Sequence, residues 1–128
     1  MEHGDRAFLA EMLAPLGAVA IRRMFGGLGL FHDRLMFGLV VRGALYLKAA
    51  PEETASFAAE GGAPFSYDVK GGRTTTIASY WRAPDRLADE PEEFVAWARR
   101  ACAAAEAADR AKPAGRRRVG RRRVGQGE

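Results

Sequence analysis

Hydrophobic positions along this chain follow a helical period in two places, near residue 10 and near residue 100. Asp5 is positioned to cap the first segment, which Pro15 and Gly17 end. The last segment has Pro91 in its first turn and fades at residues 109–112. The apolar positions at helical spacing are Phe8, Leu9, Met12, Leu13 and Leu16, and then Phe94, Trp97, Ala98, Ala101, Ala105 and Ala108. The pattern therefore predicts a helix near each end of the first 111 residues.

Between these helices the pattern is typical of strands. Residues 35–41 are a continuous apolar run, as expected for a strand covered on both faces, and residues 44–48 alternate. The remaining strands are expected at residues 19–25, 28–31, 65–69 and 74–81, with turns at 32–34, 42–43 and 71–72. A short helix should begin at residue 51 and stop near residue 61. The predicted order is helix, three or four strands, helix, two strands, helix, which is an α+β fold with helices packed on an antiparallel sheet.

Composition separates the chain into a body and a tail. With 128 residues and 48% hydrophobic composition, the chain has room for one domain, which we place at residues 1–111. Residues 112–128 hold a twice-repeated Gly-Arg-Arg-Arg-Val segment and too little apolar surface to fold, so we expect a disordered arginine-rich tail.

Charge follows the same division. The tail holds seven of the 20 basic residues and one of the 16 acidic residues, which leaves 13 basic and 15 acidic residues in the body. The body is therefore weakly acidic, and the excess positive charge lies in six arginines, Arg116, Arg117, Arg118, Arg121, Arg122 and Arg123. Guanidinium groups at this density suit phosphate, so we expect non-specific nucleic-acid affinity from the tail. Solubilisation or tethering is the alternative role.

Several classes of protein are disfavoured by what the sequence contains. One cysteine, Cys102, permits no intramolecular disulfide, and the first residues do not resemble a secretory signal. The longest apolar run, residues 35–41, is too short to span a bilayer, so we expect no transmembrane segment. These features together predict a cytoplasmic protein.

Few residues in this sequence are candidates for a catalytic role. The two histidines are His3, near the start, and His32, in a predicted turn with Asp33 and Arg34. That turn could be a ligand cluster, but an exposed turn is the favoured interpretation. Cys102 is expected to be a partly buried small residue rather than a reactive thiol. We therefore expect no catalytic residue, no cofactor, no metal ligand set and no enzymatic activity.

A candidate interaction surface combines basic, aromatic and glycine residues. Its members are Arg22, Arg23, Phe25, Gly26, Gly27, Tyr80 and Trp81. The plainer alternative is that the arginines are solvated on an exposed strand and the glycines mark a bulge or a close approach of backbone. Tyr80 and Trp81 should face opposite sides of their strand, one in the core and the other available for contact.

Several segments, in order, resemble the TfoX N-terminal domain family. The matching segments are residues 21–31 (IRRMFGGLGLF), 45–48 (LYLK), 62–67 (GAPFSY), 79–84 (SYWRAP) and 91–101 (PEEFVAWARRA). The resemblance implies a two-layer α+β sandwich similar to secretion-chaperone-like folds, and kinship with competence regulators that act on transcription. It supplies no catalytic residues. Those larger regulators carry a second, C-terminal domain, where this sequence has the arginine-rich tail.

Two functions are compatible with these observations. The first is a non-enzymatic regulatory domain that binds a protein partner, with non-specific nucleic-acid affinity from the tail. The alternative is a small-molecule binding module or minor enzyme using a cleft near Arg22, Arg23, Tyr67 and Tyr80. An open sheet edge is compatible with either a monomer or a dimer.

Overall fold

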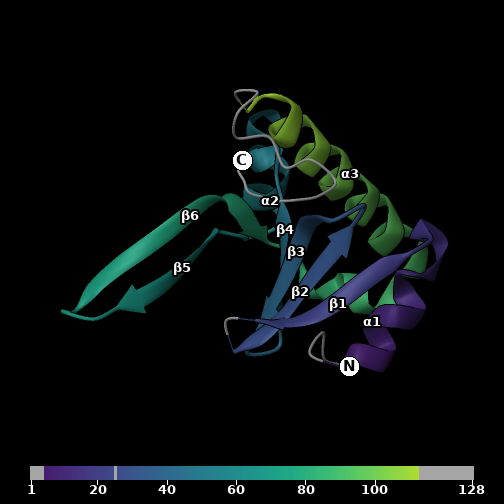
Figure 1. Cartoon of the computed structure of the whole chain (residues 1–128), viewed down its shortest axis with the longest axis horizontal. Helices are drawn as coiled ribbons and strands as arrows, with labels where there is room; N and C mark the ends of the chain where they lie inside the picture. Colours follow the sequence, from purple (N-terminus) through teal and green to yellow (C-terminus); the bar gives the residue numbers. More distant parts are fainter. Residues whose placement is uncertain (1–4, 25, 113–128) are drawn as a thin grey trace, which may run out of the picture.

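The computed structural model describes residues 5–24 and 26–112, which form an α+β domain with one sheet (Figure 1). Its helical elements are α1 (Arg6–Met12), η1 (Ala14–Leu16), η2 (Pro51–Glu53), α2 (Thr54–Ala59), η3 (Asp85–Asp89) and α3 (Pro91–Arg110). Its strands are β1 (Val19–Met24), β2 (Gly27–His32), β3 (Leu35–Val41), β4 (Ala44–Lys48), β5 (Pro64–Val69) and β6 (Arg73–Arg82). The predicted fold class is confirmed, with four strands before α2.

All strand pairs in the sheet are antiparallel, in the order β1-β2-β3-β4-β6-β5. The two predicted tight turns are present. Asp33 and Arg34 have φ values of 51° and 70°, and Arg42 and Gly43 have φ values of 52° and 79°. Two successive residues with positive φ are the backbone of the hairpin turn whose twist matches that of the flanking strands. These turns connect β2 to β3 and β3 to β4 and help to fix the register of those three strands.

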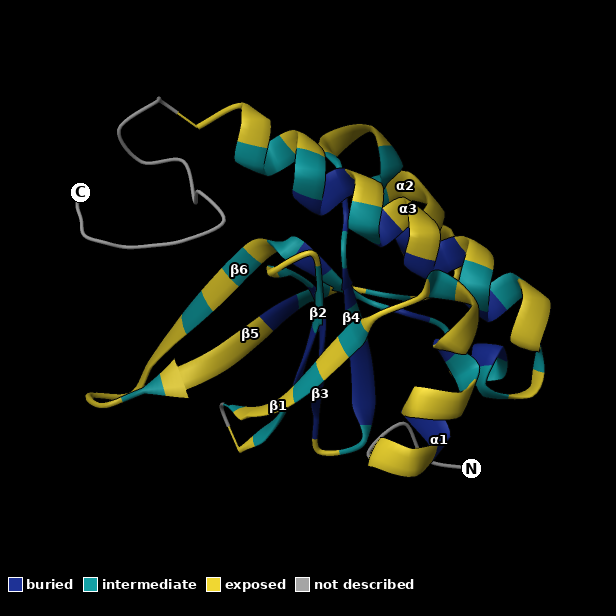
Figure 2. Cartoon of the chain, turned by 45° about the vertical axis from the view of Figure 1, so that its right-hand side comes forward, coloured by how far each residue is buried: buried dark blue, intermediate teal, exposed yellow. Residues whose placement is uncertain are grey.

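One face of the sheet carries the main core, under α3 (Figure 2). α3 turns Phe94, Trp97 and Ala101 toward the buried β3 and β4, while its other side is exposed. The Asp5 side chain caps α1 by accepting from the backbone N–H groups of Ala7 and Phe8, as predicted. The apolar stripe read from the sequence is therefore the stripe that packs.

The opposite face carries a smaller cluster built around Leu39, Val41, Phe65 and Tyr80. β3 lies between the two clusters, and its buried residues alternate between them apart from a bulge at Phe37. The prediction that residues 35–41 form a strand covered on both faces is confirmed.

β5 and the first part of β6 form an arm that extends away from the rest of the domain (Figure 1). The arm begins at an irregularity where Pro64 pairs with Trp81 but the next residue, Phe65, pairs with Ile77. Most of its residues are exposed (Figure 2). Only its base joins the second cluster, because that is where its apolar residues lie.

Two sequence predictions fall outside the described residues: Phe25 and the arginine-rich tail. Across residues 5–24 and 26–112, no helix is both long and apolar enough to cross a membrane.

Candidate functional site

The two arginines predicted on the first strand lie on the edge of the sheet, since β1 has only β2 as a neighbour. Both are exposed. Arg22 pairs in register with Gly29, and its guanidinium carbon lies 5.4 Å from the centre of the Phe31 ring. Arg23 pairs with Leu28, so it projects from the other face. Arg22 and Arg23 therefore cannot act on one ligand from the same face.

Gly26 and Gly27 have steric roles. Gly26 has a φ of 73°, which favours glycine, and Gly27 lies so close to β3 that a side-chain carbon would overlap the carbonyl oxygen of Val40. The structure at Gly27 is therefore the close approach of backbone that the sequence indicated as the plainer explanation of these glycines.

Tyr80 and Trp81 face opposite sides of β6; Tyr80 is buried and Trp81 is half-buried. Tyr80 is buried in the second cluster, where its hydroxyl donates to the carbonyl of Met36 at 2.9 Å. Burial raises the pKa of Tyr80 to about 12. Trp81 packs against the main core, and its indole N–H donates to the carbonyl of Ala78. Tyr80 is therefore a core residue, whereas Trp81 is half-buried at the edge of the main core.

A shallow groove runs between the β2–β3 turn, the adjoining sheet and the C-terminal end of α3; we call it the α3 groove. It consists of two adjoining concavities of about 500 and about 170 Å³, which share Phe31 and Arg34. Its cationic lining is Arg22, Arg34, Lys48 and Lys112, and Asp33 and Asp109 also contribute. Tyr80 lies in the wall of the smaller concavity.

Three of these cations have no carboxylate partner within ion-pair distance among the described residues: Arg22, Arg34 and Lys48. Lys48 Nζ lies 5.0 Å from the centre of the Tyr80 ring and 3.4 Å from Ser79 Oγ. Burial, and then the charge of Lys112, lower the pKa of Lys48. A partly buried cation held among other cations gains from an incoming anion, so the groove is suited to phosphate or carboxylate groups.

The four residues of the alternative cleft do not line one common cleft. Arg22 lines the larger concavity of the α3 groove and Tyr80 the smaller, adjoining one. Tyr67 is 42% exposed on the arm and lines a third concavity of about 370 Å³ with Arg42 and Asp68. The structure therefore brings Arg22 and Tyr80 to one groove, while Tyr67 lies on the arm and Arg23 on the other face of β1.

Cys102 is half-buried on α3. Burial, then the charges of Glu106 and Asp33, raise the pKa of its thiol to about 11. Little thiolate is therefore present at neutral pH, which agrees with the expectation of a structural rather than a reactive cysteine.

An ionic cluster at the other end of α3 was not found from the sequence. Arg86 on η3 makes paired contacts with the carboxylates of Glu60 and Glu93, with shortest N–O distances of 2.7 and 2.8 Å. It also contacts Glu90 at 3.0 Å. Hydrogen bonding from Arg86, supported by Trp97, lowers the pKa of Glu93 to about 2, and Glu93 in turn raises the pKa of Arg86. We call these four charged residues the Arg86 cluster.

The sequence held only part of the signal for these sites. Arg34 was predicted to lie in a turn and Lys48 in the alternating strand at residues 44–48, so neither was singled out as a binding residue. The surroundings of these side chains come from elements that are distant in sequence. The charge that lowers the pKa of Lys48, for example, belongs to Lys112, which lies 64 positions further along the chain.

Comparison with known proteins gives two findings. A family model described as the TfoX N-terminal domain matches residues 11–105. The chain is also similar to the DNA transformation protein TfoX1 of Aliivibrio fischeri (strain ATCC 700601 / ES114), with 38% identity over 79 residues. That match covers 62% of this chain and 35% of the relative, so it spans about a third of the relative's length.

Proposed function

This chain belongs to the TfoX N-terminal domain family, and on that premise we propose that it is a non-enzymatic, cytoplasmic regulatory domain acting in DNA transformation. It binds a protein partner through its folded body, and its arginine-rich tail adds non-specific affinity for nucleic acid. The observation that carries the proposal is the family match over residues 11–105, which takes in all six described strands and the first three-quarters of α3. The name of the relative supports the link to DNA transformation.

Two features of the side chains support binding rather than catalysis. The Cys102 thiol has a pKa raised to about 11, so it is a poor nucleophile. The His32 ring is held by the carbonyl of Leu16 through Nε2 at 3.2 Å, and its other nitrogen faces Asp33. Neither side chain is arranged for nucleophilic attack with base assistance.

The distribution of charge supports the nucleic-acid part of the proposal. Three cations without carboxylate partners among the described residues, Arg22, Arg34 and Lys48, lie in the α3 groove, and Lys112, the last described residue, also lines it. The six tail arginines follow in sequence within eleven positions of Lys112. Because the tail follows Lys112 directly in sequence, the proposal includes phosphate contacts made by Arg34 and Lys48 in addition to those of the tail arginines.

Gel-shift titration at several salt concentrations tests the tail. The wild-type chain is compared with a full-length variant in which all six tail arginines are replaced by glutamine, on a mixed-sequence DNA duplex. Six phosphate contacts contribute a slope of about −5 to the plot of log affinity against log salt. We expect the variant to lose that part of the slope and most of the affinity, whatever the duplex sequence.

A matched control replaces Arg73 and Arg110, which lie on the arm and at the end of α3, by glutamine. This control should keep the wild-type slope. Equal slopes for the wild-type chain and the tail variant would remove nucleic-acid binding from the proposal.

The regulatory part is tested in cells. Deletion of the gene should change the frequency of transformation by added DNA and alter transcript levels, and the wild-type gene should restore both. Gly27→Val, which cannot form the approach to Val40, should fail to restore them because the sheet is disrupted. Unchanged transformation and unchanged transcripts after deletion would contradict the proposed role.

A further inference from the structure

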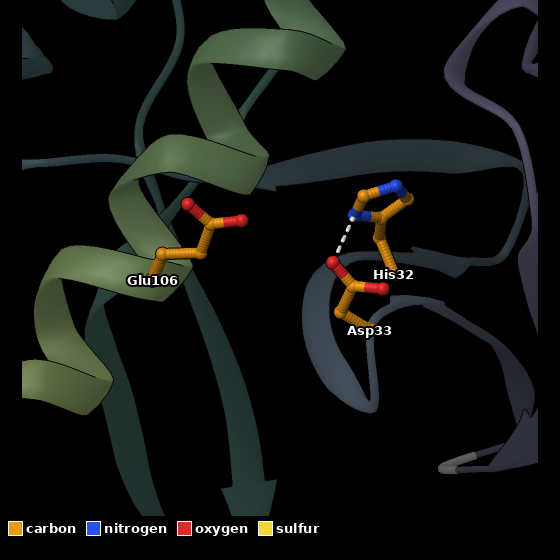
Figure 3. A group of neighbouring side chains, drawn as sticks. All are labelled: His32, Asp33 and Glu106. Carbon is orange, nitrogen blue, oxygen red and sulfur yellow. Dashed lines mark ion pairs between the residues drawn. The ribbon is translucent and has the colours of Figure 1, made fainter.

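Three side chains with metal-ligating atoms converge beside the α3 groove (Figure 3). His32 ends β2, Asp33 begins the following turn, and Glu106 comes from α3, more than seventy positions later. One ligand atom from each lies within 4.8 Å of the other two. Figure 3 shows the Asp33 carboxylate beside the ring of His32, with Glu106 extending from the helix toward both.

The hydrogen bond made by His32 determines which ring nitrogen faces the carboxylates. Nε2 lies 3.2 Å from the carbonyl oxygen of Leu16. A carbonyl only accepts, so Nε2 carries a hydrogen, and in the neutral ring Nδ1 has a lone pair. Nδ1 is the atom that lies 3.6 Å from Asp33 Oδ2. The Nδ1 lone pair and the carboxylate oxygens therefore face the same space, where they could act together as ligands of a metal ion.

The hydrogen bond between His32 Nε2 and the carbonyl of Leu16 is of the kind that holds metal-ligating histidines. A metal-ligating histidine usually donates its other N–H to a carbonyl or carboxylate, which fixes the tautomer and the ring. Here the accepting carbonyl lies in η1, and η1 is itself tied to α3, because Arg99 donates to the neighbouring carbonyl of Pro15 at 3.2 Å. The ring is therefore held in place from outside the three-residue cluster.

We propose that His32, Asp33 and Glu106 bind a divalent transition-metal ion, with Zn²⁺ as the best match to one imidazole and two carboxylates. Bonds of about 2.0–2.2 Å place the ligands of a tetrahedral ion roughly 3.3 Å apart. Rotation of the Glu106 side chain on α3 and of the 77% exposed Asp33 side chain closes the remaining distance. The two carboxylates balance the charge of the ion, and water completes its coordination.

Metal binding here joins the β2–β3 turn to α3 and neutralises two carboxylates next to Arg34. It therefore rigidifies one wall of the α3 groove and makes its potential more positive. This inference does not depend on the proposed function, since its test measures metal and not DNA.

Isothermal titration of the full-length, metal-free chain with ZnCl₂ in a non-chelating buffer tests the site. We expect one equivalent bound to the wild-type chain. His32→Gln, Asp33→Asn and Glu106→Gln should each weaken binding at least tenfold. Asp33→Asn is the safest variant for folding, because asparagine tolerates the φ of 51° at this exposed turn position.

Control variants separate this site from other donors in the chain. His3→Gln, Cys102→Ser and Glu52→Gln should each keep the single equivalent. Zinc at 100 times its wild-type dissociation constant should also raise the melting temperature of the wild-type chain by about 10 °C and that of Asp33→Asn by about half of this or less. Absence of zinc binding, or wild-type binding by His32→Gln, would overturn the proposal. Loss of binding in Cys102→Ser with retention in Glu106→Gln would equally contradict it.

Discussion

The two ends of α3 use charged residues in different ways. At the N-terminal end, Arg86 is matched by three carboxylates and the cluster is closed. At the C-terminal end, Arg34 and Lys48 lack carboxylate partners among the described residues. The carboxylates of Asp33 and Glu106 converge there on a histidine nitrogen. The same helix is thus fixed by satisfied charges at one end and bordered by unsatisfied charges at the other.

This difference separates structural charges from candidate binding charges. A charge whose hydrogen bonds are complete within the chain has little to gain from a ligand, whereas a half-buried cation beside another cation has much to gain. Substitutions at the N-terminal end should therefore change stability, and substitutions at the C-terminal end should change binding. The predictions below are ordered by their expected effect on stability.

Phe94→Ala should have the largest effect. Phe94 is 1% exposed in the first turns of α3, next to the Arg86 cluster. Truncation of a buried phenylalanine removes apolar burial and leaves a cavity, which costs about 3–5 kcal/mol. Urea unfolding followed by circular dichroism measures the loss. Ala96→Gly, at an exposed position of the same helix, should cost only about 1 kcal/mol through helix propensity.

Arg86→Met should lower the urea midpoint by less than Phe94→Ala. The substitution leaves the carboxylates of Glu60, Glu90 and Glu93 close together with no cation between them. Arg82→Met is the matched control, since Arg82 makes a single ion pair with Asp85 on an exposed surface. A midpoint for Arg86→Met equal to that of Arg82→Met would show that the Arg86 cluster does not stabilise the domain.

Acid should weaken the same end of α3. The pKa of Glu93 is lowered from its ordinary value of 4.5 to about 2, so the carboxylate is easier to ionise in the folded state. Its contribution is complete above the unfolded pKa and is lost as pH falls from about 4.5 toward 2. Urea midpoints measured from pH 7 to pH 3 should fall more steeply for the wild-type chain than for Glu93→Gln. Parallel curves would contradict the lowered pKa.

Lys48→Met should have the smallest effect on stability, with a midpoint equal to or above that of the wild-type chain. Burial and Lys112 disfavour the charged form of Lys48, and methionine keeps most of the apolar stem without the charge. Thermal unfolding at neutral pH gives the comparison. A clear loss of stability would mean that the contacts of the Lys48 ammonium with Ser79 and Tyr80 outweigh the cost of its burial.

The fold was predictable from local patterns because those patterns decide which face of each element is buried. The stripe of Phe94, Trp97 and Ala101 identified α3, and the continuous apolar run at residues 35–41 identified a strand covered on both faces. The irregularity between Pro64 and Phe65, which allows the arm to extend from the body, has no local pattern that would reveal it.

The candidate site was predictable only in part, since it is made by residues far apart in sequence. Arg22 was singled out and does line the larger concavity, but Lys48 and Glu106 became notable only through α3 and the strand order. His32 and Asp33 read as a turn because their partner is supplied by a helix over seventy positions away. Residues that only the tertiary fold brings together have no characteristic spacing that a single sequence could reveal.

The most direct test of the contrast between the two ends of α3 is the salt dependence of duplex DNA binding. It compares the wild-type chain, Arg86→Met and the double variant Arg34→Gln with Lys48→Met, each measured where it is fully folded. Each lost phosphate contact reduces the slope by about 0.9. We predict an unchanged slope for Arg86→Met and a slope about 2 smaller for the double variant. Identical slopes for all three proteins, or a reduced slope for Arg86→Met alone, would contradict the assignment of binding to the C-terminal end of α3.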